Sequence, residues 1–247
     1  MDRHSCIGET VAQITGSEIQ SSRPLTGGDV AASYCVTLAD GRTVFAKTHA
    51  DPPGQFFDTE ARGLAWLSEA NALPVPVVLG ASDEPPLLVL EWIDEASTLP
   101  RDDAAFGTGL AQLHHAGAPC FGRTDRRTTG SRGLPNEPCD TWIDFYETQR
   151  LLPLIRLARD SDIYDDRQLA VFAAVASRLD VVGGPPEPPA RLHGDLWAGN
   201  RIVDRFGTSW LIDPACHGGH REFDLAMMQL FGGFDDTVEM LVGELGE

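Results

Sequence analysis

The sequence predicts an α+β protein of two lobes, with a mainly antiparallel-sheet N-terminal lobe over residues 1–94 and a mainly helical C-terminal lobe over residues 95–247. Two observations predict this division. β-rich runs separated by turn signals fill much of the chain before residue 94, and helical periodicity replaces them afterwards. A third observation concerns function: residues 191–213 carry an acid, an amide and a second acid, at positions 195, 200 and 213.

The composition limits the classes of partner. Hydrophobic residues make up 42 % and charged residues 23 % of the chain, as in ordinary globular proteins, but the net charge is −18. A charge of this size repels nucleic acid and anionic membrane surfaces, so we expect neither as a partner. A bound nucleotide would need a local group of cations, backbone amides and Mg²⁺.

The cysteine pattern and the apolar runs predict a cytoplasmic protein. The five cysteines are odd in number and form no C-x-x-C pair, which is typical of reduced thiols. The first residues, MDRHSCIGET, lack the apolar region of a secretory signal. No apolar run approaches the ~20 residues that span a bilayer.

The elements expected in the N-terminal lobe are strands and two helices. Asp40-Gly41 between two β-rich runs predicts a two-residue hairpin. The expected elements are residues 8–22 (helix), 33–38 (strand), 43–47 (strand), 56–71 (helix) and 87–93 (strand).

Four residues of this lobe are candidates for holding nucleotide phosphates. Gly27 and Gly28 form a turn before the hairpin, Lys47 ends its return strand, and Glu60 lies in the following helix. This order is found over the ATP phosphates of kinases, where the glutamate orients the lysine. Taken alone, the glycines are also compatible with an ordinary turn, and Glu60 with a solvated helix surface.

The apolar strand at residues 87–93 ends in Glu91, Trp92 and Ile93. In a two-lobed kinase this position links the lobes and its backbone binds the adenine edge. We therefore expect these three residues to contact the base of ATP. A plain buried strand is the alternative.

The C-terminal lobe is expected to be helical around one long loop. Residues 118–139 lack periodicity, and a loop of this length could roof an acceptor pocket. The helix at 165–179 has one apolar stripe, expected to be core, formed by Leu169, Phe172, Ala173, Ala176 and Leu179. The other expected segments are residues 102–117 (helix), 142–151 (helix, interrupted by Pro153) and 183–189 (connector).

Residues 191–213 predict a phosphoryl-transfer centre. Asp195 would accept the proton of the acceptor hydroxyl, and Asn200 and Asp213 would hold Mg²⁺ against the nucleotide phosphates. Each of the latter two could alone be a turn residue, but their order after Lys47 and Glu60 favours a protein-kinase-like fold that uses ATP. His193 precedes a glycine here, which favours a scaffold role.

At this point the motifs resemble those of one family. The segment HGDLWAGN at residues 193–200, followed by LIDPA at 211–215, is similar to the fructosamine kinases, within the aminoglycoside-phosphotransferase-like small-molecule kinases. The segments GHREFDLAM at 219–227 and FGGF at 231–234 are similar to the same family. The resemblance covers roughly residues 24–234.

The resemblance implies an activity. Its members phosphorylate, with ATP, a sugar hydroxyl of a ketosamine, the adduct formed when a sugar glycates an amine. Phosphorylation at the 3-position makes the adduct unstable, which implies a role in deglycation. The acceptor would be a small-molecule or a protein-bound ketosamine.

The resemblance also implies residue roles. It makes Asp195 the catalytic base, Asn200 and Asp213 the metal ligands, and Asp224 a brace of the catalytic loop together with His193. The remaining candidates share a position on the acceptor side of the site, and they are Trp197, His217 and His220.

Two alternatives stay open. One is a kinase of another small hydroxylated acceptor, such as an aminoglycoside, choline or a free sugar. The other is an inactive nucleotide-binding member, because the chain ends at Glu247 whereas family members usually continue into further helices.

Overall fold

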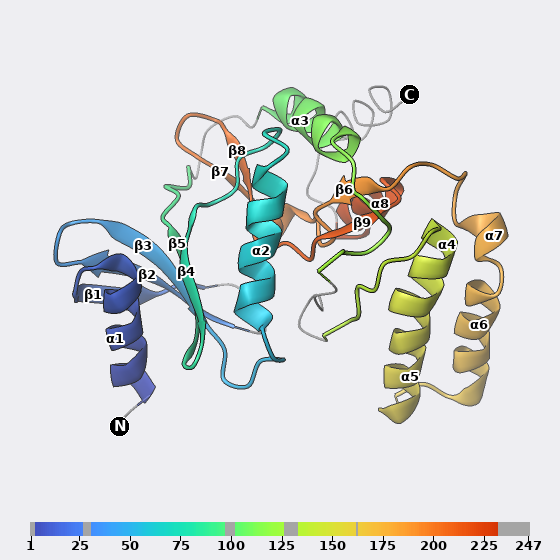
Figure 1. Ribbon diagram of the computed structural model, residues 1–247, viewed down its shortest axis with the longest axis horizontal. Helices are drawn as coiled ribbons and strands as arrows, with labels where there is room; N and C mark the ends of the chain where they lie inside the picture. Colours follow the sequence, from blue (N-terminus) through green and yellow to red (C-terminus); the bar gives the residue numbers. More distant parts are fainter. Residues whose placement is uncertain (1–2, 27–30, 97–101, 126–132, 162, 232–247) are drawn as a thin grey trace.

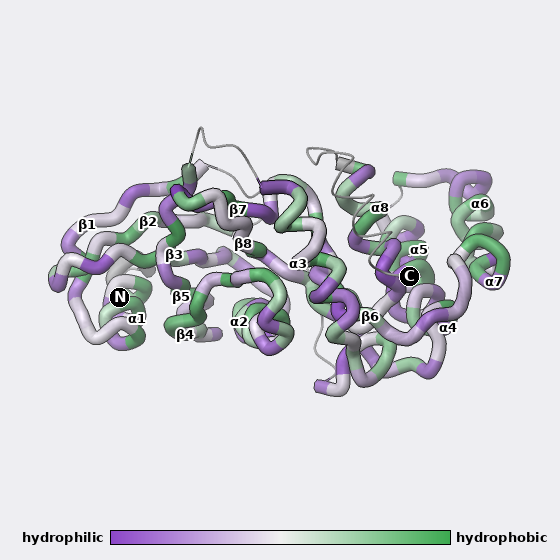
Figure 2. The backbone as a smooth tube through the Cα atoms, turned by 90° about the horizontal axis from the view of Figure 1, so that it is seen from above, coloured by the Kyte–Doolittle hydropathy of each residue, from purple (hydrophilic) through white to green (hydrophobic). Residues whose placement is uncertain are grey.

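A computed structural model of the chain describes residues 3–26, 31–96, 102–125, 133–161 and 163–231. The described elements lie along one long axis, with the five-stranded sheet at one end and helices α4–α7 at the other (Figure 1). Figure 2 shows the same order from above, with β6 and α8 between the two ends. The structure thus has the two-lobed α+β architecture that the sequence predicts.

The N-terminal lobe is an antiparallel sheet of strand order β1-β2-β3-β5-β4 with two helices. Alternate residues of β5 pack on opposite faces of this sheet. Leu87 and Val89 join the cluster that includes Val11 of α1, whereas Leu88 and Leu90 join the cluster of α2. The elements are α1 (Arg3–Thr15), β1 (Ile19–Pro24), β2 (Ala32–Leu38), β3 (Thr43–Thr48), α2 (Phe56–Ser68), β4 (Val78–Asp83) and β5 (Pro86–Glu91).

The expected helix at residues 8–22 is wrong in its second half. Helix α1 ends at Thr15, and Gly16 adopts φ 71°, the left-handed conformation that commonly terminates helices. Ile19 then begins β1. The sequence predicts no bounds for strands β1 and β4, because both are edge strands without fully buried side chains and lack apolar alternation.

The hairpin at Asp40-Gly41 is confirmed, but its loop is longer than the two residues expected. The amide of Leu38 donates to the carbonyl of Arg42 at 2.8 Å, so Ala39, Asp40 and Gly41 form the loop. Strands β2 and β3 pair in register from Ala32 opposite Thr48 to Thr37 opposite Thr43, and Gly41 has φ 88° at the turn. This register places Lys47 near the end of β3.

Helix α2 belongs to both lobes. Phe57 and Leu64 pack under the sheet with Leu88, whereas Leu67 packs with Phe106 in the core of the C-terminal lobe. A helix that contributes to two cores fixes the position of one lobe against the other, and it carries Glu60 between them.

The described part of the C-terminal lobe is mainly helical, with two short two-stranded sheets and one 3₁₀ turn around the catalytic segment. Its elements are α3 (Asp103–His115), α4 (Trp142–Phe145), a π-helical turn (Tyr146–Leu151), α5 (Leu152–Asp160), α6 (Asp166–Ala176), α7 (Leu179–Val182), β6 (Ala190–Leu192), a 3₁₀ turn (Ala198–Asn200), β7 (Arg201–Val203), β8 (Ser209–Leu211), β9 (His217–Gly219) and α8 (Glu222–Phe231). Strand β6 pairs with β9, and β7 pairs with β8.

Two helical expectations in this lobe need correction. Pro153 does not end the helix that starts at Trp142, because a π-helical turn precedes it and the proline occupies the start of α5. The stripe of α6 is only partly core: Leu169 and Ala176 are buried, but Phe172 is 38 % exposed.

Directly after residue 94 the chain pairs with the segment at the end of β7. Glu95 forms an isolated bridge with Asp204, and the amide of Ala96 donates to the carbonyl of Val203 at 2.9 Å. The lobe boundary at residue 94 stays a prediction, which this pairing supports.

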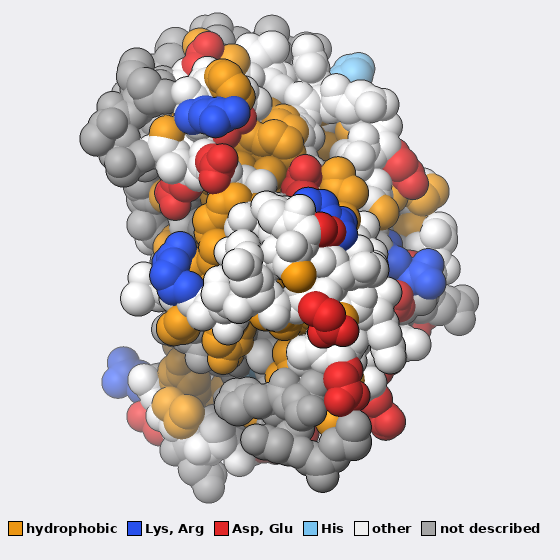
Figure 3. All heavy atoms as spheres, turned by 90° about the vertical axis from the view of Figure 1, so that its left-hand side faces the viewer, with side chains coloured by type: hydrophobic (Ala, Val, Ile, Leu, Met, Phe, Trp, Pro, Cys, Tyr) orange, Lys and Arg blue, Asp and Glu red, His pale blue; other side chains and the backbone are white. Residues whose placement is uncertain are grey.

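The surface and the helices bear on possible partners. On the face at the sheet end of the molecule, acidic and basic side chains are interspersed with apolar ones (Figure 3). Within the described ranges, no helix is both long and apolar enough to cross a membrane.

Candidate active site

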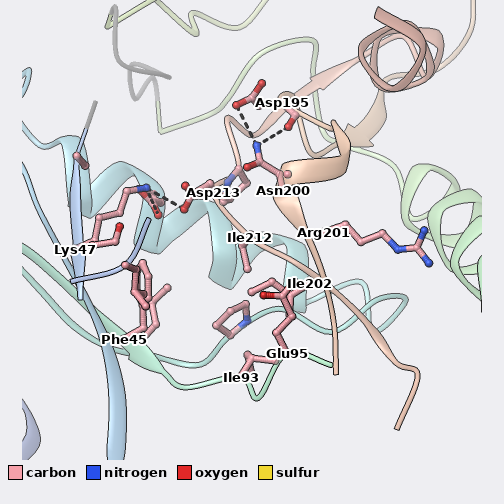
Figure 4. Close-up of a pocket in the computed structure, with 18 of the residues that line it drawn as sticks. Phe45, Lys47, Ile93, Glu95, Asp195, Asn200, Arg201, Ile202, Ile212 and Asp213 are labelled. Atoms are coloured by element: carbon pink, nitrogen blue, oxygen red, sulfur yellow. Dashed lines mark hydrogen bonds and ion pairs between the residues drawn. The ribbon is translucent and has the colours of Figure 1, made fainter. Parts of the chain in front are cut away.

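A cleft of about 730 Å³ lies between the lobes (Figure 4). Its walls come from β3, α2 and the end of β5 on one side, and from the segment around Asp195 and Asp213 on the other. The cleft brings together most of the predicted site residues, namely Lys47, Glu60, Glu91, Trp92, Ile93, Asp195, Trp197, Asn200 and Asp213. Gly27 and Gly28 lie outside the described residues.

Lys47 is held between two carboxylates. Its Nζ lies 3.1 and 3.2 Å from the two carboxylate oxygens of Glu60 and 2.9 Å from Oδ1 of Asp213. Burial opposes the charge of Lys47, but the two carboxylates outweigh it and raise the pKa of the ammonium. Lys47 is therefore a fixed cation in the cleft.

Glu60 is buried, not solvated, with its side chain 8 % exposed. Burial raises the pKa of Glu60 to about 7; the Lys47 charge opposes this shift and Asp213 adds to it. The carboxylate thus depends on Lys47 for its ionised form.

Asn200 is hydrogen-bonded to Asp195. The Asn200 side-chain amide donates to the main-chain oxygen of Asp195 at 2.8 Å and to its carboxylate Oδ2 at 3.1 Å. Burial raises the pKa of Asp195, although the His193 ring and Asn200 offset part of the shift. A raised pKa favours proton acceptance by this carboxylate.

His193 is fully buried and both ring nitrogens are engaged. Nε2 lies 2.9 Å from the carbonyl oxygen of Ile212, and Nδ1 accepts from the amide of Asp195 at 3.3 Å. Nδ1 is then an acceptor and Nε2 a donor, which describes a neutral imidazole, and burial lowers the pKa of His193. These contacts are those of a scaffold residue that ties the Asp195 loop to the segment of Asp213.

Gly194 and Asp224 set the path of the catalytic loop. Gly194 has φ 82°, and a Cβ at this position would overlap with the carbonyl oxygen of Ala215. The carboxylate of Asp224 accepts from the amide of His193 at 2.9 Å and from the amide of Gly194 at 2.8 Å. The backbone just before Asp195 is thus fixed from two sides.

Asp213 presents a carboxylate to the cleft from an unusual backbone conformation. Its side chain is 38 % exposed and its φ is 52°, in the left-handed region that few non-glycine residues adopt. Within the described residues no group of three or more His, Cys, Asp or Glu side chains could hold a metal on its own. The amide of Asn200 and the carboxylate of Asp213 supply two oxygen ligands, a number that suits Mg²⁺ when nucleotide phosphates supply others.

The cleft has apolar walls that sequence analysis missed. Phe45 lines it from the N-terminal lobe, and Ile202 and Ile212 line it from the other lobe, on the side opposite Phe45 (Figure 4). Phe45 could have been found, because it lies two residues before Lys47 on β3 and shares its face. Ile93 also lines this part of the cleft, as expected.

Arg201 joins strand β7, which lines the cleft, to the start of helix α3. Its guanidinium points away from the cleft (Figure 4), forms an ion pair with Asp103 at 2.6 Å and lies 4.2 Å from the ring centroid of Phe106. No local pattern could predict this pairing, because it joins β7 to the start of α3.

Of the three residues expected on the acceptor side, one lines the cleft and two do not. Trp197 lines the cleft and is 39 % exposed. His217 and His220 are buried, at 1 % and 3 % exposure, and are not among the residues lining the cleft. His217 instead stacks on Phe145, with ring centroids 5.2 Å apart, and Nε2 of His220 lies 3.2 Å from the carbonyl oxygen of Pro185. Their acceptor-side role stays a prediction.

The burial of His217 predicts acid-sensitive stability. Burial, and secondarily the Arg150 charge, lower the pKa of His217 from 6.5 to about 3. Unfolding lets the ring take up a proton below pH 6.5, so the free energy of unfolding should fall as the pH drops from about 6.5 to about 3, by up to about 1.4 kcal/mol per pH unit.

Denaturant unfolding of the wild type and His217→Gln over this pH range checks the prediction. The variant should lose this part of the slope, whereas His115→Gln, at an exposed position, should keep it. Equal slopes in the wild type and His217→Gln would contradict it.

The Lys47–Glu60 pair predicts an effect on nucleotide affinity. Glu60→Gln removes a buried charge partner of Lys47, so we expect KM for ATP to rise about 10-fold. The control is Asp58→Asn on the same helix, whose ion pair with Arg62 is solvent-exposed and contributes little. Steady-state kinetics with varied ATP compares the two, and equal KM values would show that Glu60 does not position the lysine.

The sequence of the chain is similar to those of known small-molecule kinases. A model of the fructosamine kinase family matches residues 4–239. The chain is 35 % identical over 238 residues to a probable ketoamine kinase of Synechocystis sp., covering 92 % of this chain and 78 % of that protein. It is 32 % identical over 226 residues to a probable ketoamine kinase of Lactiplantibacillus plantarum, covering 91 % of this chain and 79 % of that protein.

Solved structures of kinases are also similar to this chain. The crystal structure of a "putative fructosamine-3-kinase" from Thermobifida fusca shares 38 % sequence identity with a TM-score of 0.86, and the match covers 97 % of this chain and 83 % of that one. An aminoglycoside phosphotransferase, APH(2")-IIa, is 16 % identical with a TM-score of 0.69, over all of this chain and 81 % of that one, and shares the fold. The chain belongs to the fructosamine kinase family.

Proposed function

We propose that this protein transfers the γ-phosphoryl group of ATP to a sugar hydroxyl of a ketosamine. One observation carries the proposal: Lys47, Asp213, Asn200 and Asp195 line a single cleft in a chain of the fructosamine kinase family. Matched relatives include probable ketoamine kinases and an Arabidopsis thaliana protein-ribulosamine 3-kinase, 32 % identical over 207 residues.

The nucleotide would occupy the part of the cleft next to the link between the lobes. Phe45 from the N-terminal lobe, Ile93 from the link, and Ile202 and Ile212 from the C-terminal lobe would form apolar walls for the adenine ring. The backbone that follows Glu91 at the end of β5 would bind its edge. Glu91 is itself fixed, because its amide donates to the carbonyl of Val77 and its carboxylate accepts from the amide of Val77.

The phosphates would lie toward Lys47. Its ammonium, held by Glu60, would neutralise the α- and β-phosphates. The carboxylate of Asp213 and the side-chain oxygen of Asn200 fit Mg²⁺, since the Asn200 amide nitrogen already donates to Asp195 and leaves the oxygen for a cation. The ion, when bound, would neutralise charge on the β- and γ-phosphates.

Asp195 would act on the acceptor. Its carboxylate takes the proton of the sugar hydroxyl, and the hydroxyl oxygen forms a bond to the γ-phosphorus. The bond from that phosphorus to the bridging oxygen breaks, and ADP leaves with the electron pair. Asn200 and His193 hold Asp195 in place for this step.

The biological role would be removal of sugar adducts from amines in the cytoplasm. Phosphorylation at the sugar 3-position, as the family resemblance implies, destabilises the adduct. The location rests on five cysteines that are all free in the structure. The high negative charge of the chain supports an amine-bearing acceptor over nucleic acid.

An acceptor panel tests the proposal. Purified protein with Mg²⁺ and ATP is given lysine glycated by ribose, lysine glycated by glucose, free ribose, choline and an aminoglycoside, and ADP release is followed by a coupled assay. We expect turnover with one or both glycated lysines and background rates with the others. Turnover confined to choline, the free sugar or the aminoglycoside would show that this acceptor, and not a ketosamine, is the substrate.

A further inference from the structure

A buried carboxylate lies behind the catalytic loop and receives three hydrogen bonds. Asp224, at the start of α8, is fully buried. Besides the amides of His193 and Gly194, it accepts from Nε2 of His114 at 3.0 Å. His114 is in the last turn of α3, 110 residues away in the chain. The three contacts join the end of α3 to the backbone just before Asp195.

His114 supplies the side-chain donor in this group. Among the described residues, it is the side chain that donates to Asp224, because both ring nitrogens of His193 are already engaged with Ile212 and with the amide of Asp195. The ionised carboxylate is acceptor-only, so Nε2 of His114 carries the hydrogen. Burial opposes ionisation of Asp224, and the His114 hydrogen bond leads the interactions that nevertheless lower the pKa of this carboxyl.

Loss of this donor would leave each of the two buried carboxylate oxygens with a single partner. Oδ2 accepts from both His114 and the amide of His193, whereas Oδ1 accepts from the amide of Gly194. A buried charge with fewer hydrogen bonds is free to reorient or to protonate. Either change loosens the two peptide groups that aim Asp195.

We propose that His114 is a positioning residue for phosphoryl transfer, acting through Asp224 on the backbone of His193 and Gly194 and so on the orientation of Asp195. The inference rests on the proposed function, in which Asp195 receives the hydroxyl proton. His114 itself touches neither the cleft nor the reacting atoms: the residues lining the 730 Å³ cleft do not include it.

A second pocket makes this role open to chemical rescue. It has a volume of about 230 Å³, lies beside the end of α3, and is lined by His114, His115, Glu187, Pro188 and Arg221 among others. His114 is 5 % exposed and separates this pocket from Asp224. Replacing the imidazole by a methyl group would extend the pocket to the carboxylate and give free imidazole a route to it.

The test compares His114→Ala with His115→Ala. His115 is the next residue, is exposed and lines the same second pocket, so it is a matched control. We expect His114→Ala to lower kcat about 10²-fold with little change in KM for ATP, since small errors in placing a catalytic group have effects of this size. Added imidazole should restore kcat in a saturable manner, and His115→Ala should behave as the wild type.

Two further variants cover the case in which His114→Ala does not fold. His114→Gln keeps an amide donor at a similar reach and should retain much of kcat, whereas His114→Leu fills the space without a donor and should not. Equal kcat values for these two variants would overturn the proposal. So would a folded His114→Ala with the kcat of the wild type, or imidazole that raises its Tm without raising kcat.

Amide hydrogen exchange gives a readout independent of turnover. Peptides covering residues 193–195 should exchange faster in His114→Ala than in the wild type or His115→Ala, and imidazole should slow them again. If the wild type transfers no phosphoryl group to any acceptor, the proposed function fails, and these exchange rates still decide whether His114 holds the loop. Unchanged exchange would overturn the positioning role.

Discussion

Asp195→Asn should lower kcat with a ketosamine acceptor by about 10²- to 10⁴-fold while leaving ATP binding intact. The amide has the size of the carboxylate but cannot take the proton of the acceptor hydroxyl. The backbone of the loop should stay in place, because the hydrogen bond from Asn200 to the main-chain oxygen of residue 195 does not depend on the side chain. Steady-state kinetics and isothermal titration with ATP and Mg²⁺ measure the two effects separately.

Asp213→Asn provides the contrast for this variant. It removes the carboxylate that faces Lys47 and that, in the proposed function, holds Mg²⁺ against the phosphates, so nucleotide binding should weaken along with kcat. Asp195→Asn should instead affect kcat alone. If Asp195→Asn keeps the kcat of the wild type, Asp195 is not the base, and another group must take the proton.

Gly194→Ala should lower the free energy of unfolding by about 3 kcal/mol or more, which is more than a typical single substitution costs. Two effects add at this position. The residue has φ 82°, where an L-residue is strained, and the new Cβ would overlap with the carbonyl oxygen of Ala215. Because that oxygen belongs to backbone, relief requires the Asp195 loop to move, so kcat should fall as well.

Gly41→Ala separates these two effects. Gly41 has φ 88° at the hairpin turn, but a Cβ there meets no atom within 4 Å. It should therefore show only the cost of backbone strain, about 1–2 kcal/mol, and full activity in the remaining folded protein. Denaturant melts and kcat for both variants make the comparison. Equal losses in the two would mean that the contact with Ala215 is not important.

Elements with buried, patterned side chains could be predicted from the sequence. The β2–β3 hairpin follows from Asp40-Gly41, and β5 follows from four consecutive residues that are buried in the structure. Strands β1 and β4 could not be predicted, because edge strands leave most side chains in water and keep no alternation. Phe172 illustrates the opposite error, an apolar residue in a helical stripe that the described structure leaves 38 % exposed.

Some residues of the candidate site could likewise be predicted from the sequence, and others could not. Residues that follow one another closely, such as Asp195, Asn200 and Asp213, carry a spacing that points to their chemistry. Contacts between distant segments carry no such signal: Arg201 with Asp103, and His114 with Asp224, depend on how α3 packs in the C-terminal lobe. The packing of His217 carried no such signal either, since its position beside a site motif did not reveal that its ring stacks in an aromatic core.

The most direct test of the ketosamine kinase assignment is the identity of the product. Glycated lysine, ATP and Mg²⁺ are incubated with the wild type and with Asp195→Asn, and the acceptor is analysed by mass spectrometry and phosphorus NMR. The account predicts an acceptor that has gained one phosphoryl group on the 3-hydroxyl of its sugar with the wild type, and far less of it with the variant. ATP that binds in the cleft without any phosphorylated glycated lysine, in a preparation that remains folded, would contradict it.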